Sequence, residues 1–174
     1  MTREFAHHFK ECIGVDISER MIAKAKELNA SVPGCHFIVN PYDDLRIFPD
    51  NHFDLVYSGF VLQHIPRRQI IELLIFEFVR VVKKKGLLVF QLPSYIPLRN
   101  RIQLRRRLYA LLRAVGANER TLYYKLHLHP LCASFIPQKR VTDLLMGINA
   151  NILGVRRDPK YGSAVESRTY FITK

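Results

Sequence analysis

Apolar runs alternate with amphipathic, helix-like segments along most of this chain of 174 residues. Runs rich in β-branched and aromatic residues and bounded by turn residues predict strands, and six runs have this character: 11–16, 35–40, 53–58, 87–94, 151–156 and 167–173. Helical periodicity predicts helices at 18–29, 67–82 and 137–148, and residues 4–9 read as the end of another helix. Ser18 is the expected N-cap of its helix, whose apolar stripe is Met21, Ala25 and Leu28.

The alternation of strands and helices predicts an α/β fold with a mostly parallel sheet and helices on both faces, a three-layer arrangement. The connection between the last two strands is too short for a crossover helix, so the last strand should be antiparallel. Residues 96–130 interrupt the alternation, because they are basic, aromatic and helix-like and contain no strand. We expect a single domain over 1–174, with 96–130 as a helical insert or cap.

Composition places the chain among intracellular proteins. No apolar run reaches the roughly 18 residues that a membrane span needs, and the first twelve residues are too charged for a secretory signal. Three scattered cysteines favour a reducing compartment, so we expect a cytoplasmic protein. His127, His129 and Cys132 lack a fourth ligand and tight spacing, so we predict no metal site.

The net charge of +12 is concentrated in residues 97–125, which hold eight Lys or Arg residues against one acid, Glu119. Two sets of side chains recur along this segment: an apolar stripe of Leu108, Leu111, Leu112 and Val115, and a basic face of Arg99, Arg106 and Arg113. One interpretation is a helical cap packed over a site, with a solvated basic face. The alternative is a surface for anionic lipid or an acidic substrate. The stacking pattern of a nucleic-acid surface is missing.

In an open parallel sheet, ligands bind beyond the carboxyl ends of the strands, so residues at strand ends are the candidates for a site. They are Asp16 and Ile17, then Asn40 to Tyr42, then Ser58 and Gly59, then Pro93 and Ser94. A carboxylate at a strand tip can accept hydrogen bonds from both hydroxyls of a ribose. Asp16 is therefore either a ribose ligand or a helix cap.

Three stretches, "GVDIS..M", "FPDNHFDLVYSGFVLQHIP" and "EFVRVVKKKGLLVFQLPS", resemble in order and spacing the second, fourth and fifth strand regions of class I S-adenosylmethionine-dependent methyltransferases. The closing "ESRTYFITK" is similar to the last strand of that family. The resemblance covers nearly the whole chain outside 96–130. It implies a Rossmann-like fold with S-adenosylmethionine as cofactor.

The resemblance also implies roles for single residues. Asp16 would hold the ribose hydroxyls, and Ile17 would pack on the adenine. Ser58 and Gly59 would lie beside the methionine part of the cofactor, with Gln63 and His64 near the methyl group. For His64 we favour a structural role over that of a general base, because alignment of acceptor and methyl group supplies much of the rate.

The chain departs from the family pattern at two places. The family's adenine-binding acid is replaced by Pro41; Asp43 or Asp44 could substitute, and the Tyr42 backbone N–H could still serve. No glycine-rich loop precedes Asp16, which suggests a methyltransferase that lacks its first strand and this loop. Because that strand lies between 11–16 and 53–58 in the family, we expect these two strands not to pair with each other.

We therefore predict methyl transfer from S-adenosylmethionine to a small-molecule or lipid-like acceptor bound under 96–130, with activity and cofactor affinity impaired by the missing loop. The alternative is a non-catalytic remnant or binding module that keeps the fold without cofactor affinity. The sequence does not identify the acceptor, because such inserts vary among proteins of one fold.

Overall fold

The computed structural model describes residues 1–97, 104–128, 134–158 and 165–174. The chain divides into two compact units, Met1–Phe48 and Pro49–Lys174, and each is described by itself. The described strands form two sheets, one of order β1-β2 and one of order β3-β4-β6-β5. As expected, strand 11–16 pairs with 35–39 and not with 53–58.

The first unit contains α1 (Thr2–Phe5), β1 (Cys12–Asp16), α2 (Glu19–Leu28) and β2 (Cys35–Val39). The two strands are parallel, with Asp16 opposite Val39. Ser18 caps α2 as predicted, since its Oγ accepts a hydrogen bond of 3.3 Å from the Met21 N–H. The predicted stripe is wrong at Met21 and Leu28, which are exposed, whereas Ala25 is half-buried and Ile22 is the buried residue of α2. The less exposed side of the helix therefore runs through Ile22 and Ala25.

The second unit begins with β3 (Phe53–Ser58), the short helix η1 (Leu62–His64) and α3 (Arg68–Val81). β4 (Val82–Tyr95) follows α3 without a turn, so the helix ends one residue before the predicted end at 82. After β4 come α5 (Leu104–Ala114), the π-helical turn η2 (Thr121–Lys125), α6 (Gln138–Gly147), β5 (Asn151–Arg157) and β6 (Glu166–Thr173).

In the four-stranded sheet, only β6 runs against the other strands. β3 is parallel to β4, and β6 is antiparallel to both β4 and β5. The prediction of a mostly parallel α/β fold with an antiparallel last strand is therefore confirmed. Because β6 lies between β4 and β5, the last strand is an inner strand of this sheet.

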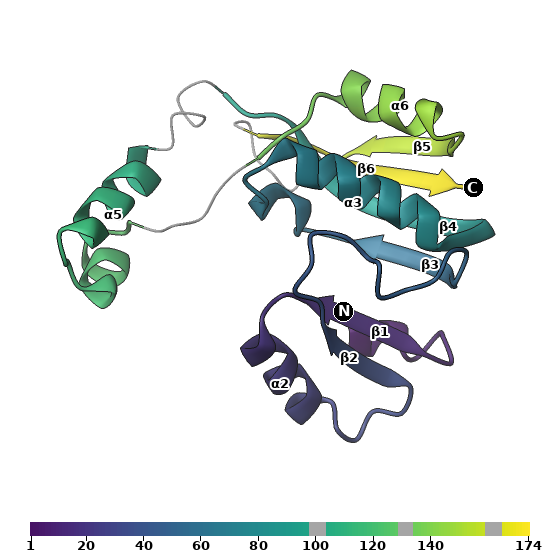
Figure 1. Cartoon of the computed structure of the whole chain (residues 1–174), viewed down its shortest axis with the longest axis horizontal. Helices are drawn as coiled ribbons and strands as arrows, with labels where there is room; N and C mark the ends of the chain where they lie inside the picture. Colours follow the sequence, from purple (N-terminus) through teal and green to yellow (C-terminus); the bar gives the residue numbers. More distant parts are fainter. Residues whose placement is uncertain (98–103, 129–133, 159–164) are drawn as a thin grey trace. The chain divides into compact units, whose positions relative to one another are not determined.

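The core of the second unit lies on one face of this sheet. Leu88, Phe90 and Leu92 alternate along β4 and are fully buried, and Tyr170 of β6 stacks on Phe90 with ring centroids 4.8 Å apart. α3 and α6 supply the opposing side chains, among them Ile71, Ile75, Phe78, Val141 and Leu145. Figure 1 shows both helices lying along this sheet. The opposite face carries the intervening residues of β4, among which Val89 and Gln91 are buried as well.

Candidate functional site

The end of β1 carries an exposed carboxylate whose two oxygens have different roles. Asp16 Oδ1 accepts a hydrogen bond of 2.8 Å from the Ser18 backbone N–H, which fixes the turn into α2. Oδ2 makes no hydrogen bond within the described residues. Beside it, the Ile17 side chain is 68% exposed. A fixed carboxylate with a free oxygen and a neighbouring apolar surface suits a ribose and a flat ring.

The turn after β2 lies beside this carboxylate. The Asn40 N–H donates to the Asp16 carbonyl oxygen over 3.0 Å, which joins the carboxyl ends of the two strands. The Tyr42 N–H donates to Asn40 Oδ1 at 3.3 Å, so the backbone donor expected to serve adenine is already engaged. The Tyr42 ring is half exposed and lies under the Arg46 guanidinium, 5.0 Å from its carbon.

Of the two acids considered as substitutes at Pro41, only one has a free carboxylate. Arg46 binds both oxygens of Asp44, with Nε 2.9 Å from each and Nη2 2.6 Å from Oδ2. Asp43 is exposed and makes no side-chain interaction within the described residues. The acid open to an incoming donor in this turn is therefore Asp43.

In the second unit, Ser58 is buried and ends β3, and Gly59 follows it. A Cβ atom at Gly59 would lie 2.6 Å from the Tyr57 hydroxyl oxygen, so glycine lets that hydroxyl approach the backbone. Phe60 has a left-handed backbone, with φ of 62°, which is strained for an aromatic residue. Such strain is concentrated at binding and catalytic sites.

Gln63 and His64 lie in η1, just beyond this turn. Their Nε2 atoms are 3.2 Å apart, and because an amide nitrogen only donates, the ring nitrogen of His64 is the acceptor. The Gln63 carbonyl accepts a hydrogen bond of 2.8 Å from the Ser134 N–H. Gln63 therefore anchors η1, and the Nε2 lone pair of His64 is occupied in this arrangement.

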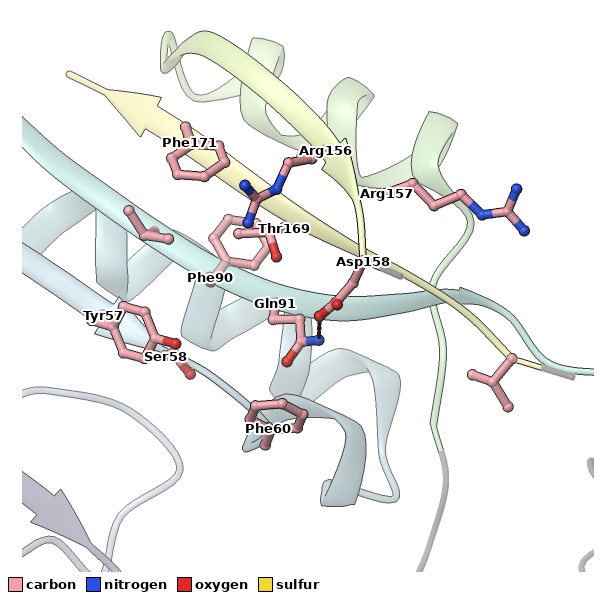
Figure 2. Close-up of a pocket in the computed structure, with 12 residues that line it drawn as sticks. Tyr57, Ser58, Phe60, Phe90, Gln91, Arg156, Arg157, Asp158, Thr169 and Phe171 are labelled. Atoms are coloured by element: carbon pink, nitrogen blue, oxygen red, sulfur yellow. Dashed lines mark hydrogen bonds between the residues drawn. The ribbon is translucent and has the colours of Figure 1, made fainter. Parts of the chain in front are cut away.

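An open hollow of about 850 Å³ lies on the sheet face opposite the core of the second unit. All four strands of the second unit and the turns at their ends line the hollow, which Figure 2 shows. The lining residues are Tyr57, Ser58, Phe60, Val89, Phe90, Gln91, Arg156, Arg157, Asp158, Val165, Thr169 and Phe171. This volume lies in the range of small-molecule sites. None of the lining residues belongs to the described part of 96–130.

Gln91 and Asp158 form the polar centre of the hollow. The buried Gln91 amide donates from Nε2 to Asp158 Oδ2, and Figure 2 shows the two side chains turned toward each other. Sequence reasoning missed both residues. Gln91 gave a signal, as the one amide within the apolar run "LLVFQL", whereas Asp158 meets it only through the pairing of β6 with β4 and β5.

Metal-ligand clusters and membrane-spanning helices were both sought in the described ranges. No group of three potential metal ligands occurs there, although His129 and Cys132 fall outside those ranges. Of the helices described, none is long and apolar enough to cross a bilayer.

The family described as a methyltransferase domain matches residues 1–90 of the chain. A methyltransferase from Methanosarcina mazei described as dependent on S-adenosylmethionine is 19% identical with a TM-score of 0.70, over 98% of this chain and 85% of that one. The N-methyltransferase NodS of Bradyrhizobium japonicum, in complex with S-adenosylhomocysteine, is 14% identical with a TM-score of 0.63, over 99% and 71%. Magnesium protoporphyrin IX methyltransferase of Synechocystis, also with S-adenosylhomocysteine, is 18% identical with a TM-score of 0.62, over 99% and 68%. No curated protein matches the chain.

Proposed function

The chain belongs to the methyltransferase domain family, and from this premise we propose that it transfers a methyl group from S-adenosylmethionine to a small-molecule acceptor in the cytoplasm. The observation that carries the proposal is the end of β1, where Asp16 keeps Oδ2 available beside the exposed Ile17 side chain. When bound, the cofactor supplies an activated methyl group on its sulfonium.

The first unit would hold the nucleoside part of the cofactor. Asp16 Oδ2 would accept from a ribose hydroxyl, while Oδ1 continues to hold the turn through Ser18. Ile17 would cover one face of the adenine. Asp43, whose carboxylate is not engaged by Arg46, would accept from the adenine amino group. The Tyr42 ring would border this site, but its N–H would not contribute, since Asn40 holds it.

The second unit would hold the methionine part and the acceptor. Ser58 and Gly59 lie at the end of β3 and would face the methionine part, with Gln63 in the adjoining η1. The hollow borders Ser58 and contains aromatic rings and the Gln91–Asp158 pair, so we place the acceptor there. His64 would orient Gln63, because its Nε2 is the acceptor in their contact. Alignment of the acceptor is then the main catalytic contribution of the chain.

One observation favours the rival function, a binding module without catalysis. The turn after β2 is closed on itself, since Asn40 Oδ1 accepts from the Tyr42 N–H and Asn40 Nδ2 donates to the Asp44 carbonyl over 2.6 Å. A turn closed in this way leaves few free groups for adenine, so under this function we expect weak binding of S-adenosylmethionine and low activity.

Equilibrium dialysis with methyl-labelled S-adenosylmethionine tests the proposal. We expect retention of label that unlabelled S-adenosylhomocysteine displaces and adenosine displaces less well. Incubation with the small-molecule fraction of a cell extract should then move label into that fraction. Thr169→Phe, which fills the hollow, should lower this transfer and leave retention unchanged. Retention without transfer would refute catalysis, and no retention would refute the methyl transfer and favour the rival, which keeps the fold without cofactor affinity.

A further inference from the structure

Helix α5 leaves its apolar side chains in solvent. None of its eleven residues is buried. Leu104, Leu108 and Leu111 follow the helical spacing of one face, and Val115 continues it, since its N–H donates to the Leu111 carbonyl over 3.3 Å. All four side chains are exposed. We call this set the α5 stripe.

Arginines flank the α5 stripe on both sides. Arg105 directly follows Leu104 and Arg107 directly precedes Leu108, and the helical rotation of about 100° per residue places them on opposite sides of the stripe. Arg106 and Arg113 occupy the far face of the helix. α5 contains no acid, so its charge is uncompensated within the helix. An apolar stripe between long cationic side chains is the pattern of helices that lie in a membrane interface.

The turn after α5 adds exposed aromatic rings. Leu122 of η2 is buried, but its neighbours Tyr123 and Tyr124 and the following Leu126 are exposed. Tyrosine is favoured at the boundary between lipid and water, because its ring is apolar and its hydroxyl is polar. The segment 104–126 therefore presents apolar, aromatic and cationic groups together.

We infer that α5 docks the protein on an anionic lipid surface, with the α5 stripe in the acyl boundary and Arg105 and Arg107 on the phosphates. Charge complementarity identifies this occupant. A second copy would bring the arginines of two α5 helices together without an acid on either helix to pair with them. The inference does not depend on the proposed methyl transfer.

Vesicle flotation of the full chain tests this inference. The protein is mixed with vesicles of pure phosphatidylcholine or of phosphatidylcholine and phosphatidylserine in equal amounts. We expect flotation with the anionic vesicles only, and weaker flotation as salt is added. No flotation with either vesicle, or equal flotation with both, would overturn the inference.

Leu111→Glu should lower the partition onto anionic vesicles by about tenfold or more, because a charge replaces a leucine that would enter the lipid. Leu153→Glu is the matched control, since Leu153 of β5 and Leu111 are both 63% exposed, and it should float like the parent chain. Arg105→Gln and Arg107→Gln should each cost about fivefold, while Arg20→Gln on α2 should cost little.

Light scattering without lipid distinguishes the second copy as occupant. A dimer that Leu111→Glu converts to a monomer would overturn the inference. Equal flotation of Leu111→Glu and Leu153→Glu would also overturn it, because binding would then involve another surface. Melting curves of the two variants should match that of the parent chain, since both positions are exposed.

Discussion

The Ser18 backbone N–H donates to only one oxygen of Asp16, Oδ1, over 2.8 Å. One carboxylate oxygen therefore fixes the turn, and the other can accept a hydrogen bond from a ligand. This division lets a single substitution separate the two interpretations of Asp16, helix cap and ribose ligand.

Asp16→Asn should weaken binding of S-adenosylhomocysteine and leave the melting temperature nearly unchanged. The asparagine carbonyl can still accept from Ser18, but an NH2 group replaces Oδ2 and cannot accept. Loss of a charge-assisted hydrogen bond costs about 1.5–3 kcal/mol, or at least about tenfold in affinity. Asp16→Ala should lose both binding and stability. If dialysis showed the same affinity for S-adenosylhomocysteine in Asp16→Asn as in the parent chain, Asp16 would act only as a helix cap.

Asp43→Ala should remove the preference of the chain for an adenine over a hypoxanthine base. If Asp43 accepts from the adenine amino group, its loss weakens S-adenosylhomocysteine and leaves the inosine analogue, which lacks that group, unaffected. Asp44→Ala is the control, because its carboxylate is held by Arg46 and its loss should lower stability only. Competition dialysis with both ligands measures the preference. An equal preference in the parent chain and in Asp43→Ala would contradict this role.

Arg80→Ala should destabilise the second unit by about 2–4 kcal/mol. Arg80 binds the buried Glu77 carboxylate through two hydrogen bonds of 2.7 Å, and these bonds raise the pKa of Arg80. Without Arg80 that buried carboxylate loses these two charge-assisted hydrogen bonds. Lys83→Ala is the control, because Lys83 and Asp54 are both exposed and such pairs contribute about 0–1 kcal/mol. If Arg80→Ala and Lys83→Ala lowered the free energy of unfolding in urea by the same amount, burial of Glu77 would not strengthen its pairing with Arg80.

Tyr170 should make the fold sensitive to alkali. Burial raises the pKa of Tyr170 to about 12, above the usual value of 10.0. The unfolded chain therefore loses this proton first, and the contribution of Tyr170, complete below pH about 10, is lost as the pH rises toward 12. The difference amounts to about 2–3 kcal/mol.

Tyr170→Phe should flatten this alkaline loss in urea unfolding at a series of pH values. At neutral pH the substitution should cost little, because the Tyr170 hydroxyl has no hydrogen-bond partner among the described residues. If the parent chain and Tyr170→Phe lost the same stability at alkaline pH, groups other than Tyr170 would cause the loss.

The local parts of this fold could be predicted from the sequence, and the long-range parts could not. Strand 53–58 and the Ser18 cap depend on neighbouring residues, and both were predicted correctly. The buried side of α2 was not, because Met21 and Ile22 are equally apolar and only packing against the sheet distinguishes them. The Gln91–Asp158 pair joins residues 67 positions apart, which no local pattern encodes. The left-handed Phe60 had no signal, since glycine or asparagine normally adopts that backbone.

The central claim is that the end of β1 binds S-adenosylmethionine through Asp16. The most direct test is an NMR titration of the isotope-labelled chain with S-adenosylmethionine, which detects weak binding and locates it. We predict saturable shifts of the amide signals of Ile17, Ser18 and Asp43, with a midpoint at least about tenfold higher in Asp16→Asn. Shifts confined to other residues, or the same midpoint in both chains, would contradict the account.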